Sequence, residues 1–164
     1  MRVYLATTMT GLTKLLADES VEVPVAHAVT PALREWYVEG DAEELEYAAL
    51  TTAARASLHE LAGDPSAPPR RVVLAAEVPD PSARPAPDIE RAAVRLAGPV
   101  PLRDVVSAHV DDEAAADDVR RAVAALGAAE AGDEDAQFVV DGVEDHELGW
   151  FAAQEIGPLV ELEG

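Results

Sequence analysis

Short runs of apolar residues, separated by polar turns, recur along the chain and predict β-strands. The clearest is Arg71–Val78 (RVVLAAEV), whose apolar residues are nearly continuous, as in a strand covered on both faces. Pro24 should confine the start of another strand, Val21–Val29, to an edge or entry position, because proline cannot donate a ladder hydrogen bond. Weaker patterns of the same kind predict strands at Arg2–Thr7, at Ala92–Leu96 and, after one helical turn, within Leu102–Val110.

Two helices are predicted within Ala28–Gly63, which contains the longest helical pattern in the chain. Thr30 is a good N-cap, and Pro31 occupies the favoured first helical position. A short helix should therefore begin there and run through Trp36 and Tyr37. These two aromatic side chains are either a surface platform for stacking or anchors of the helix in the core. We favour the core, because aromatic residues at helical spacing are usually buried.

A longer helix follows, because Asp41 and Glu44 have the spacing of a capping box. Gly63 and Pro65 should end it. Its apolar residues recur every three or four positions and predict a stripe that packs on the sheet. The stripe consists of Tyr47, Leu50, Ala54, Leu58 and Leu61.

The remaining segments predict three more helices and two loops. The helices are expected at about Thr10–Ala17, Glu113–Leu126 and Asp145–Ile156, whereas Gln137–Val140 fits either a helix or a strand. The loops are the proline-rich stretches 64–70 and 79–87. The second has four prolines in nine residues and should contain no regular structure.

Together these elements predict a single domain over residues 1–164, of the α/β (or α+β) class. Helical patterns separate the first three predicted strands, so we expect βαβ crossovers and parallel pairing in the N-terminal half. The later strands follow one another closely and should add in antiparallel fashion. The expected architecture is a mixed sheet flanked by helices.

Charge limits the classes of partner. The formal net charge is −20, from 32 acidic and 12 basic residues. The acidic C-terminal half, residues 111–164, contains 16 of the acids and only two of the bases. Such a surface repels phosphates and anionic lipids, so we expect no direct binding to nucleic acid or membranes. It attracts cations or a basic protein partner, or it serves only solubility.

The absence of cysteine excludes disulfides, thiolate metal ligands and cysteine nucleophiles. No secretory signal precedes the first predicted strand, and no apolar run is long enough to cross a membrane. We therefore expect a cytoplasmic protein.

Four stretches carry a resemblance that covers nearly the whole sequence: AVTPALREWYVEGDAEELEYAALTTAARASL, RRVVLAAEVPD, PLRDVVSAHVDD and GDEDAQFVVDGVEDHELGWFAAQE. Through them the chain resembles a family of small actinobacterial proteins of unknown function. The resemblance implies a recurring bacterial cytoplasmic protein. It implies no activity, cofactor or catalytic residue.

If the sheet is parallel, the carboxyl ends of its strands meet at one edge, where ligands commonly bind. Thr8 and Thr30 would lie there at helix N-termini and could hold a phosphate or carboxylate, with Glu77 nearby. Thr8, Thr30 and Arg34 are therefore candidate ligand-binding residues. The simpler alternatives are that the threonines cap helices and that Arg34 forms ion pairs with nearby glutamates. The glycine-rich motifs GxxxxGK[ST] and GxGxxG are absent.

His109, Asp111 and Asp112 form a candidate metal site. Their oxygen atoms suit Mg²⁺, Mn²⁺ or Ca²⁺, and the histidine favours Mn²⁺ or Zn²⁺. A second acidic cluster extends from Asp141 to Glu147. Neither has a recognised ligand spacing, and acids before a helix ordinarily complement its dipole. No other cofactor is evident.

Two functions remain open. The working hypothesis is a non-enzymatic cytoplasmic interaction or regulatory protein, which binds a basic protein partner through its acidic C-terminal half. The alternative is a metal- or phosphate-dependent enzyme with its site at the carboxyl edge of the sheet, around Thr8, Thr30 and Asp111.

Overall fold

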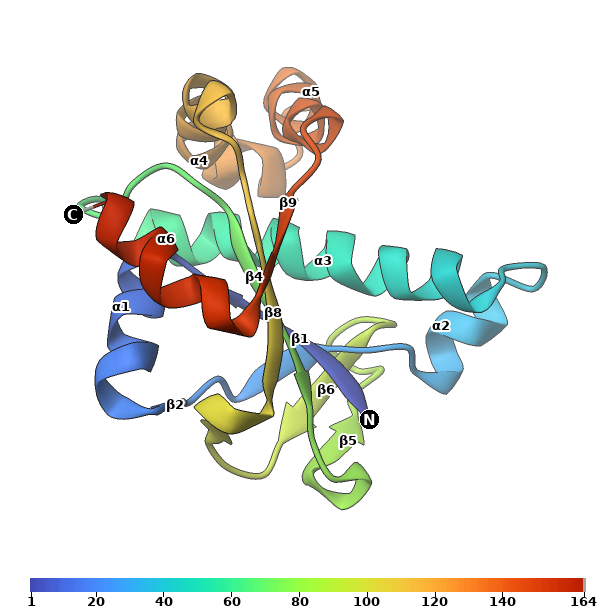
Figure 1. Ribbon diagram of the computed structural model, residues 1–164. Helices are drawn as coiled ribbons and strands as arrows, with labels where there is room; N and C mark the ends of the chain where they lie inside the picture. Colours follow the sequence, from blue (N-terminus) through green and yellow to red (C-terminus); the bar gives the residue numbers. More distant parts are fainter. Residues whose placement is uncertain (164) are drawn as a thin grey trace.

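The computed structural model describes residues 1–163 and confirms the predicted class: one domain in which helices flank a β-sheet (Figure 1). The strands are β1 (Arg2–Thr7), β2 (Ser20–Val21), β3 (Val25–His27), β4 (Val72–Glu77), β5 (Ala83–Pro85), β6 (Ala93–Leu96), β7 (Val100–Pro101), β8 (Val105–Val110) and β9 (Gly149–Ala152). The α-helices are α1 (Met9–Asp18), α2 (Pro31–Trp36), α3 (Ala42–Gly63), α4 (Ala116–Glu130), α5 (Glu134–Gly142) and α6 (Ile156–Glu163).

The main sheet has the strand order β5-β6-β3-β1-β4-β8-β9, and β2 pairs with β7 beside it. The predicted parallel pairing is wrong, because every pair of neighbouring strands in residues 1–163 is antiparallel. A helical crossover through α2 and α3 does join β3 to β4. However, β1 lies between these two strands and pairs antiparallel with both, so they never meet.

Apolar side chains alternate between the two faces of the central strands, and helices cover both faces. Val3, Leu5 and Leu74 pack against α1 and α6, whereas Tyr4 and Val73 pack against α3. Figure 1 shows α6 in front of the strands and α3 behind them. Because helices cover both faces of the sheet, successive residues of these strands are apolar, and their sequences are nearly continuous apolar runs.

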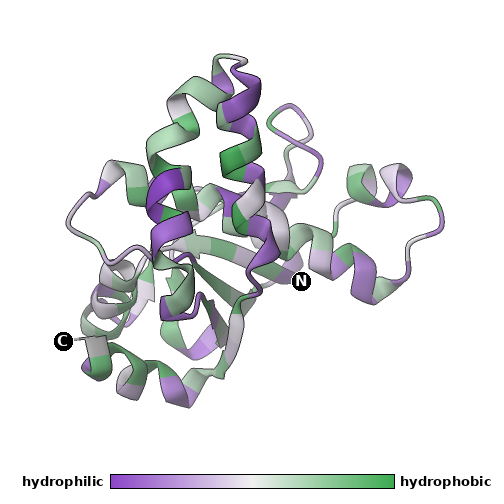
Figure 2. Ribbon diagram, turned by 90° about the horizontal axis from the view of Figure 1, so that it is seen from above, coloured by the Kyte–Doolittle hydropathy of each residue, from purple (hydrophilic) through white to green (hydrophobic). Residues whose placement is uncertain are grey.

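Besides the apolar clusters on the two faces of the sheet, a third lies between the second half of α3 and the hairpin formed by α4 and α5. Its larger buried members include Leu58, Leu61, Val119, Leu126 and Val140. The helices show hydrophobic and hydrophilic bands in turn, as amphipathic helices do (Figure 2). No helix among residues 1–163 combines the length and apolar character needed to cross a bilayer.

The capping residues predicted for the central helices are confirmed. Thr30 accepts a hydrogen bond from the backbone N–H of Leu33 at 3.1 Å, and α2 begins at the next residue. Asp41 accepts one from Glu44 at 2.9 Å, and α3 then runs to Gly63. Local chemistry therefore sets both helix starts.

Two predictions in the second half of the chain are wrong. Residues 79–87 contain regular structure, since β5 pairs with β6 at the edge of the sheet, where proline is tolerated. The predicted helix Asp145–Ile156 is replaced by β9, which pairs with β8, and α6 begins only at Ile156. Gly149 is a weak helix former, and the pairing with β8 overrides the helical spacing of the apolar residues.

One buried hydroxyl fastens α3 to the sheet. Ser57 is fully buried, donates to the carbonyl of Thr7 at 2.7 Å and accepts from the N–H of Val72 at 3.1 Å. Ser57 thus joins the end of β1 to the start of β4. It hydrogen-bonds a backbone group of each strand where Thr7 and Val72 lie opposite each other.

Replacing Ser57 with alanine should lower the free energy of unfolding by about 1–3 kcal/mol, because a buried N–H and a buried C=O each lose a hydrogen bond. Urea denaturation measures this. Ser66→Ala is the matched control, since the Ser66 hydroxyl makes only an exposed bond to Asp64, and it should cost less than about 0.5 kcal/mol. Equal losses in the two variants would contradict the role of Ser57.

Candidate functional site

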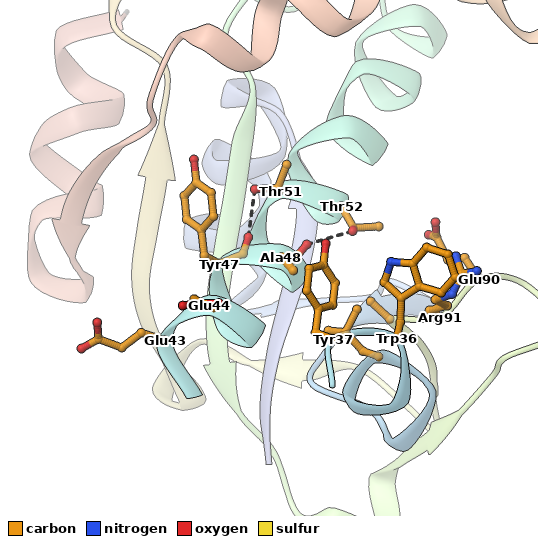
Figure 3. A pocket seen from close by; sticks show the side chains of 12 residues that line it. Trp36, Tyr37, Glu43, Glu44, Tyr47, Ala48, Thr51, Thr52, Glu90 and Arg91 are labelled. Carbon is orange, nitrogen blue, oxygen red and sulfur yellow. Dashed lines mark hydrogen bonds between the residues drawn. The ribbon is translucent and has the colours of Figure 1, made fainter. Parts of the chain in front are cut away.

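A groove of about 770 Å³ lies between α2, the first half of α3 and the segment that enters β6 (Figure 3). We call it the α2–α3 groove. Its lining residues are Leu33, Trp36, Tyr37, Glu43, Glu44, Tyr47, Ala48, Thr51, Thr52, Glu90, Arg91 and Ala92. Three of the twelve are aromatic and three are glutamates, so the groove combines flat apolar surfaces with negative charge.

The aromatic side chains of the groove are open to solvent. Trp36 is 61% exposed, Tyr37 42% and Tyr47 58%. The prediction that Trp36 and Tyr37 anchor the helix in the core is therefore wrong. The helix α2 has only six residues, and Leu33 is its only buried side chain, so the residues of its last turn project away from the domain.

Exposure of aromatic side chains is general in this protein. The chain has only two Trp, three Tyr and two Phe, and five of these seven are exposed. The other two exposed residues are Phe138 on α5, at 80%, and Trp150 on β9, at 62%. Scattered exposed apolar residues are normal, but three aromatic side chains around one groove are typical of an interaction site.

The side of the groove formed by α2 is held in place by the chain before β6. The Thr30 hydroxyl donates to the carbonyl of Arg91, and the guanidinium of Arg91 lies 3.6 Å from the centre of the Trp36 ring. That is a cation–π contact, in which the electron-rich ring face attracts the charge. Thr30 therefore positions the groove, and its hydroxyl is already engaged.

Glu90, beside Arg91, is tied to the sheet. Its carboxylate lies 2.6 Å from Nε2 of His27, a side chain that is only 3% exposed. This hydrogen bond is the main cause that lowers the pKa of Glu90 below its ordinary value of 4.5, although partial burial opposes it. Nδ1 of His27 is buried and has no hydrogen-bond partner among residues 1–163.

A lowered pKa of Glu90 has a consequence for acid stability. The ionised carboxylate is favoured in the folded state, so its contribution is present at neutral pH and is lost as the pH falls through the folded-state pKa. The wild-type protein should therefore lose stability below about pH 4.5 more steeply than a Glu90→Gln variant. Urea midpoints measured at neutral pH and at about pH 3.5 check this, and parallel losses in the two proteins would contradict it.

Negative charge surrounds the α2–α3 groove. Between Arg34 and Glu46 the chain has six acidic residues and one basic residue. Glu43 and Glu44 line the groove and form no ion pair with another residue of the described chain. Their charges remain available to a cationic ligand.

The structure separates the three residues predicted to bind a ligand. Because β1 and β3 are antiparallel, Thr8 and Thr30 follow opposite ends of the sheet. Thr8 caps α1 by accepting from Gly11 at 3.0 Å. Arg34 is exposed on α2 but does not line the groove. The alternative interpretation of the two threonines, as helix caps, is confirmed.

The residues predicted to bind a metal have other partners. Asp111 is fully buried and forms a bidentate ion pair with Arg71, with both N–O distances 2.8 Å. Asp112 accepts from the N–H of Ala114 at 2.9 Å. His109 lies 3.2 Å from the Ser107 hydroxyl, and its burial lowers the pKa of the imidazole.

These contacts do not form a ligand set. Within residues 1–163 no group of three His, Cys, Asp or Glu side chains is arranged to hold a metal ion. Sequence spacing alone cannot reveal this, because Arg71, the partner of Asp111, lies forty residues earlier, just before β4.

Several acidic side chains of the C-terminal half take part in ion pairs within the chain. Arg55 on α3 binds Asp141 at 2.6 Å and Glu144 at 3.2 Å. His146 lies 2.7 Å from Asp118, and together with Arg121 it lowers the pKa of that carboxyl. These pairs hold the α4–α5 hairpin to its neighbours, so this half is less free to bind a partner than its charge suggests.

Comparison with known proteins identifies a family and no activity. The model of the family described as "Family of unknown function (DUF6912)" matches residues 1–160. No curated protein and no solved structure is detectably similar to the chain. The resemblance to a family of unknown function is thus confirmed, whereas its actinobacterial distribution stays a prediction.

Proposed function

We propose that this chain, which belongs to the DUF6912 family of unknown function, is a non-enzymatic binding protein whose α2–α3 groove takes up a basic segment of a partner protein. The observation that carries the proposal is the exposure of Trp36, Tyr37 and Tyr47 around one hollow. Trp and Tyr dominate the energetics of protein interfaces, because each buries a large rigid surface at low entropic cost.

The charge of the groove favours a basic partner. Glu43, Glu44 and Glu90 line it, and the whole chain carries a net charge of −20. A lysine or arginine side chain of the partner can stack on an aromatic ring and meet a carboxylate at the same time. The Arg91 guanidinium on Trp36 is an example of such stacking within the chain itself.

The alternative, a metal- or phosphate-dependent enzyme at the carboxyl edge of the sheet, has less support. It requires Thr8, Thr30 and Asp111 to meet, but the antiparallel order places Thr8 and Thr30 at opposite ends. The side chain of Asp111 is enclosed with Arg71. We therefore retain binding as the function, in the cytoplasm, where the sequence predicts the protein to act.

Salt dependence tests the proposal. A partner captured from a cell lysate at low ionic strength should have a basic segment, and its affinity should fall steeply as salt is added. A Glu43→Gln/Glu44→Gln variant should show a weaker affinity and a shallower salt dependence. Binding that is insensitive to salt, or unchanged in this variant, would contradict the proposed function.

A further inference from the structure

The two edges of the main sheet are built differently. At one edge, β5 is three residues long and lies in a segment with four prolines. Pro85 lies within the strand, and the adjacent Arg84 is exposed. Proline, charge and short length are the usual means by which proteins prevent an edge strand from pairing with another chain.

The opposite edge, β9, is also short, but it lacks the proline and the charge. Its four residues, Gly149–Ala152, include no proline and no charged residue. Trp150 is 62% exposed, and Gly149 beside it is exposed too. In Figure 1, β9 runs along the outer side of β8. An exposed apolar edge of this kind is a template for a further strand.

The backbone of β9 presents hydrogen-bonding groups away from the sheet. The N–H of Ala152 donates to the carboxylate of Glu155 at 3.0 Å instead of to β8. In an antiparallel pair, alternate residues direct their N–H and C=O to the same side. The backbone groups of Trp150 therefore also face outward, where an added strand can bind them.

The charged residues around β9 indicate which kind of segment can pair with this edge. Glu147 and Glu155 flank β9, and Asp145 lies close before it. Pairing of two copies about Trp150 would bring Glu155 of one copy near Asp145 of the other, in chains that each carry −20. A basic segment would instead meet the carboxylates that flank the strand.

We propose that the edge of β9 binds an extended basic segment of a partner protein as an additional strand. Main-chain hydrogen bonds to Trp150 would give affinity, and the indole would cover alternate side chains of the segment. No residue of β9 lines the α2–α3 groove, so this interaction does not depend on the proposed function of that groove.

An alternating lysine–valine octapeptide is a suitable probe, together with a copy whose alternate backbone amides are N-methylated. In ¹⁵N-labelled protein the unmodified peptide should shift the amide signals of β9 and slow hydrogen exchange at Trp150. The methylated copy cannot form the ladder and should bind at least tenfold more weakly. Equal binding of the two peptides, shifts outside β9, or no binding would overturn the proposal.

Two variants distinguish the contribution of the Trp150 side chain to peptide binding from that of its backbone N–H. Trp150→Ala should weaken the peptide about tenfold. Trp150→Pro should weaken it further, because proline also removes the outward N–H while an edge position tolerates it. Phe138→Ala, which changes an exposed aromatic residue on α5, is the matched control and should bind as the wild type does. Formation of dimers through β9, seen by analytical ultracentrifugation, would also overturn the proposal.

Discussion

Replacing Arg71 with methionine should lower the free energy of unfolding by about 3–5 kcal/mol, because Asp111 would remain as a buried charge without its partner. Asp111 is fully buried and Arg71 is 3% exposed. The arginine side chain binds both carboxylate oxygens and also donates to the carbonyl of His146 at 2.9 Å. One side chain thus fastens the start of β4 to the end of β8 and to the segment before β9.

Urea denaturation followed by circular dichroism measures this loss. The double variant Arg71→Met/Asp111→Asn should be more stable than Arg71→Met alone, because the buried charge is gone while an amide oxygen can still accept from the backbone N–H of residue 71. If the free energy of unfolding of Arg71→Met lies within about 1 kcal/mol of the wild-type value, the Arg71–Asp111 pair does not stabilise the fold in this way.

Replacing both Trp36 and Tyr47 with alanine should weaken binding of the partner by at least about a hundredfold, because each is expected to act as an interface hot spot worth about 2 kcal/mol or more. Both side chains are mostly exposed, so their removal creates no cavity in the core. Isothermal titration calorimetry with the captured partner measures the loss, and thermal unfolding verifies that the fold is intact.

Phe138→Ala is the matched control for this pair of substitutions. Phe138 is 80% exposed, on α5, and does not line the α2–α3 groove. Its replacement should leave the affinity unchanged. Losses of similar size in the groove variant and in this control would show that exposed aromatic residues act without regard to position.

The elements that depend on local chemistry could be predicted from the sequence. The caps Thr30 and Asp41 and the end at Gly63 place α2 and α3 correctly, because the side chain that starts each helix lies next to it in the chain. The near-continuous apolar run gives β4. The Leu102–Val110 segment also begins as a helical turn and ends as β8, as predicted.

The pairing of the strands could not be predicted in the same way. Whether β3 and β4 meet depends on where β1 lies, and no local signal places β1 between them. This single insertion turns an expected parallel sheet into an antiparallel one. It also moves Thr30 and Thr8 to opposite ends, so the error in topology led directly to the error in the candidate site.

The sequence reveals the aromatic residues of the candidate site but not their exposure. Trp36, Tyr37 and Tyr47 are recognisable as rare aromatic residues, but their exposure depends on how little of α2 the domain covers. Arg91 and Glu90 come from a segment some fifty residues later, and their contacts with Trp36 and His27 arise only on folding. A short helix with aromatic residues in its last turn is the signal that could have indicated the groove.

Site-specific photo-cross-linking tests the central claim most directly. A photoreactive phenylalanine analogue placed at Tyr37, in the groove, and separately at Phe138, outside it, can be irradiated in cells and in lysates. We expect one basic protein to cross-link at Tyr37 through a lysine- or arginine-rich segment and not at Phe138. Cross-linking to the same protein at both positions, or at neither, would contradict the assignment of the α2–α3 groove as the binding site.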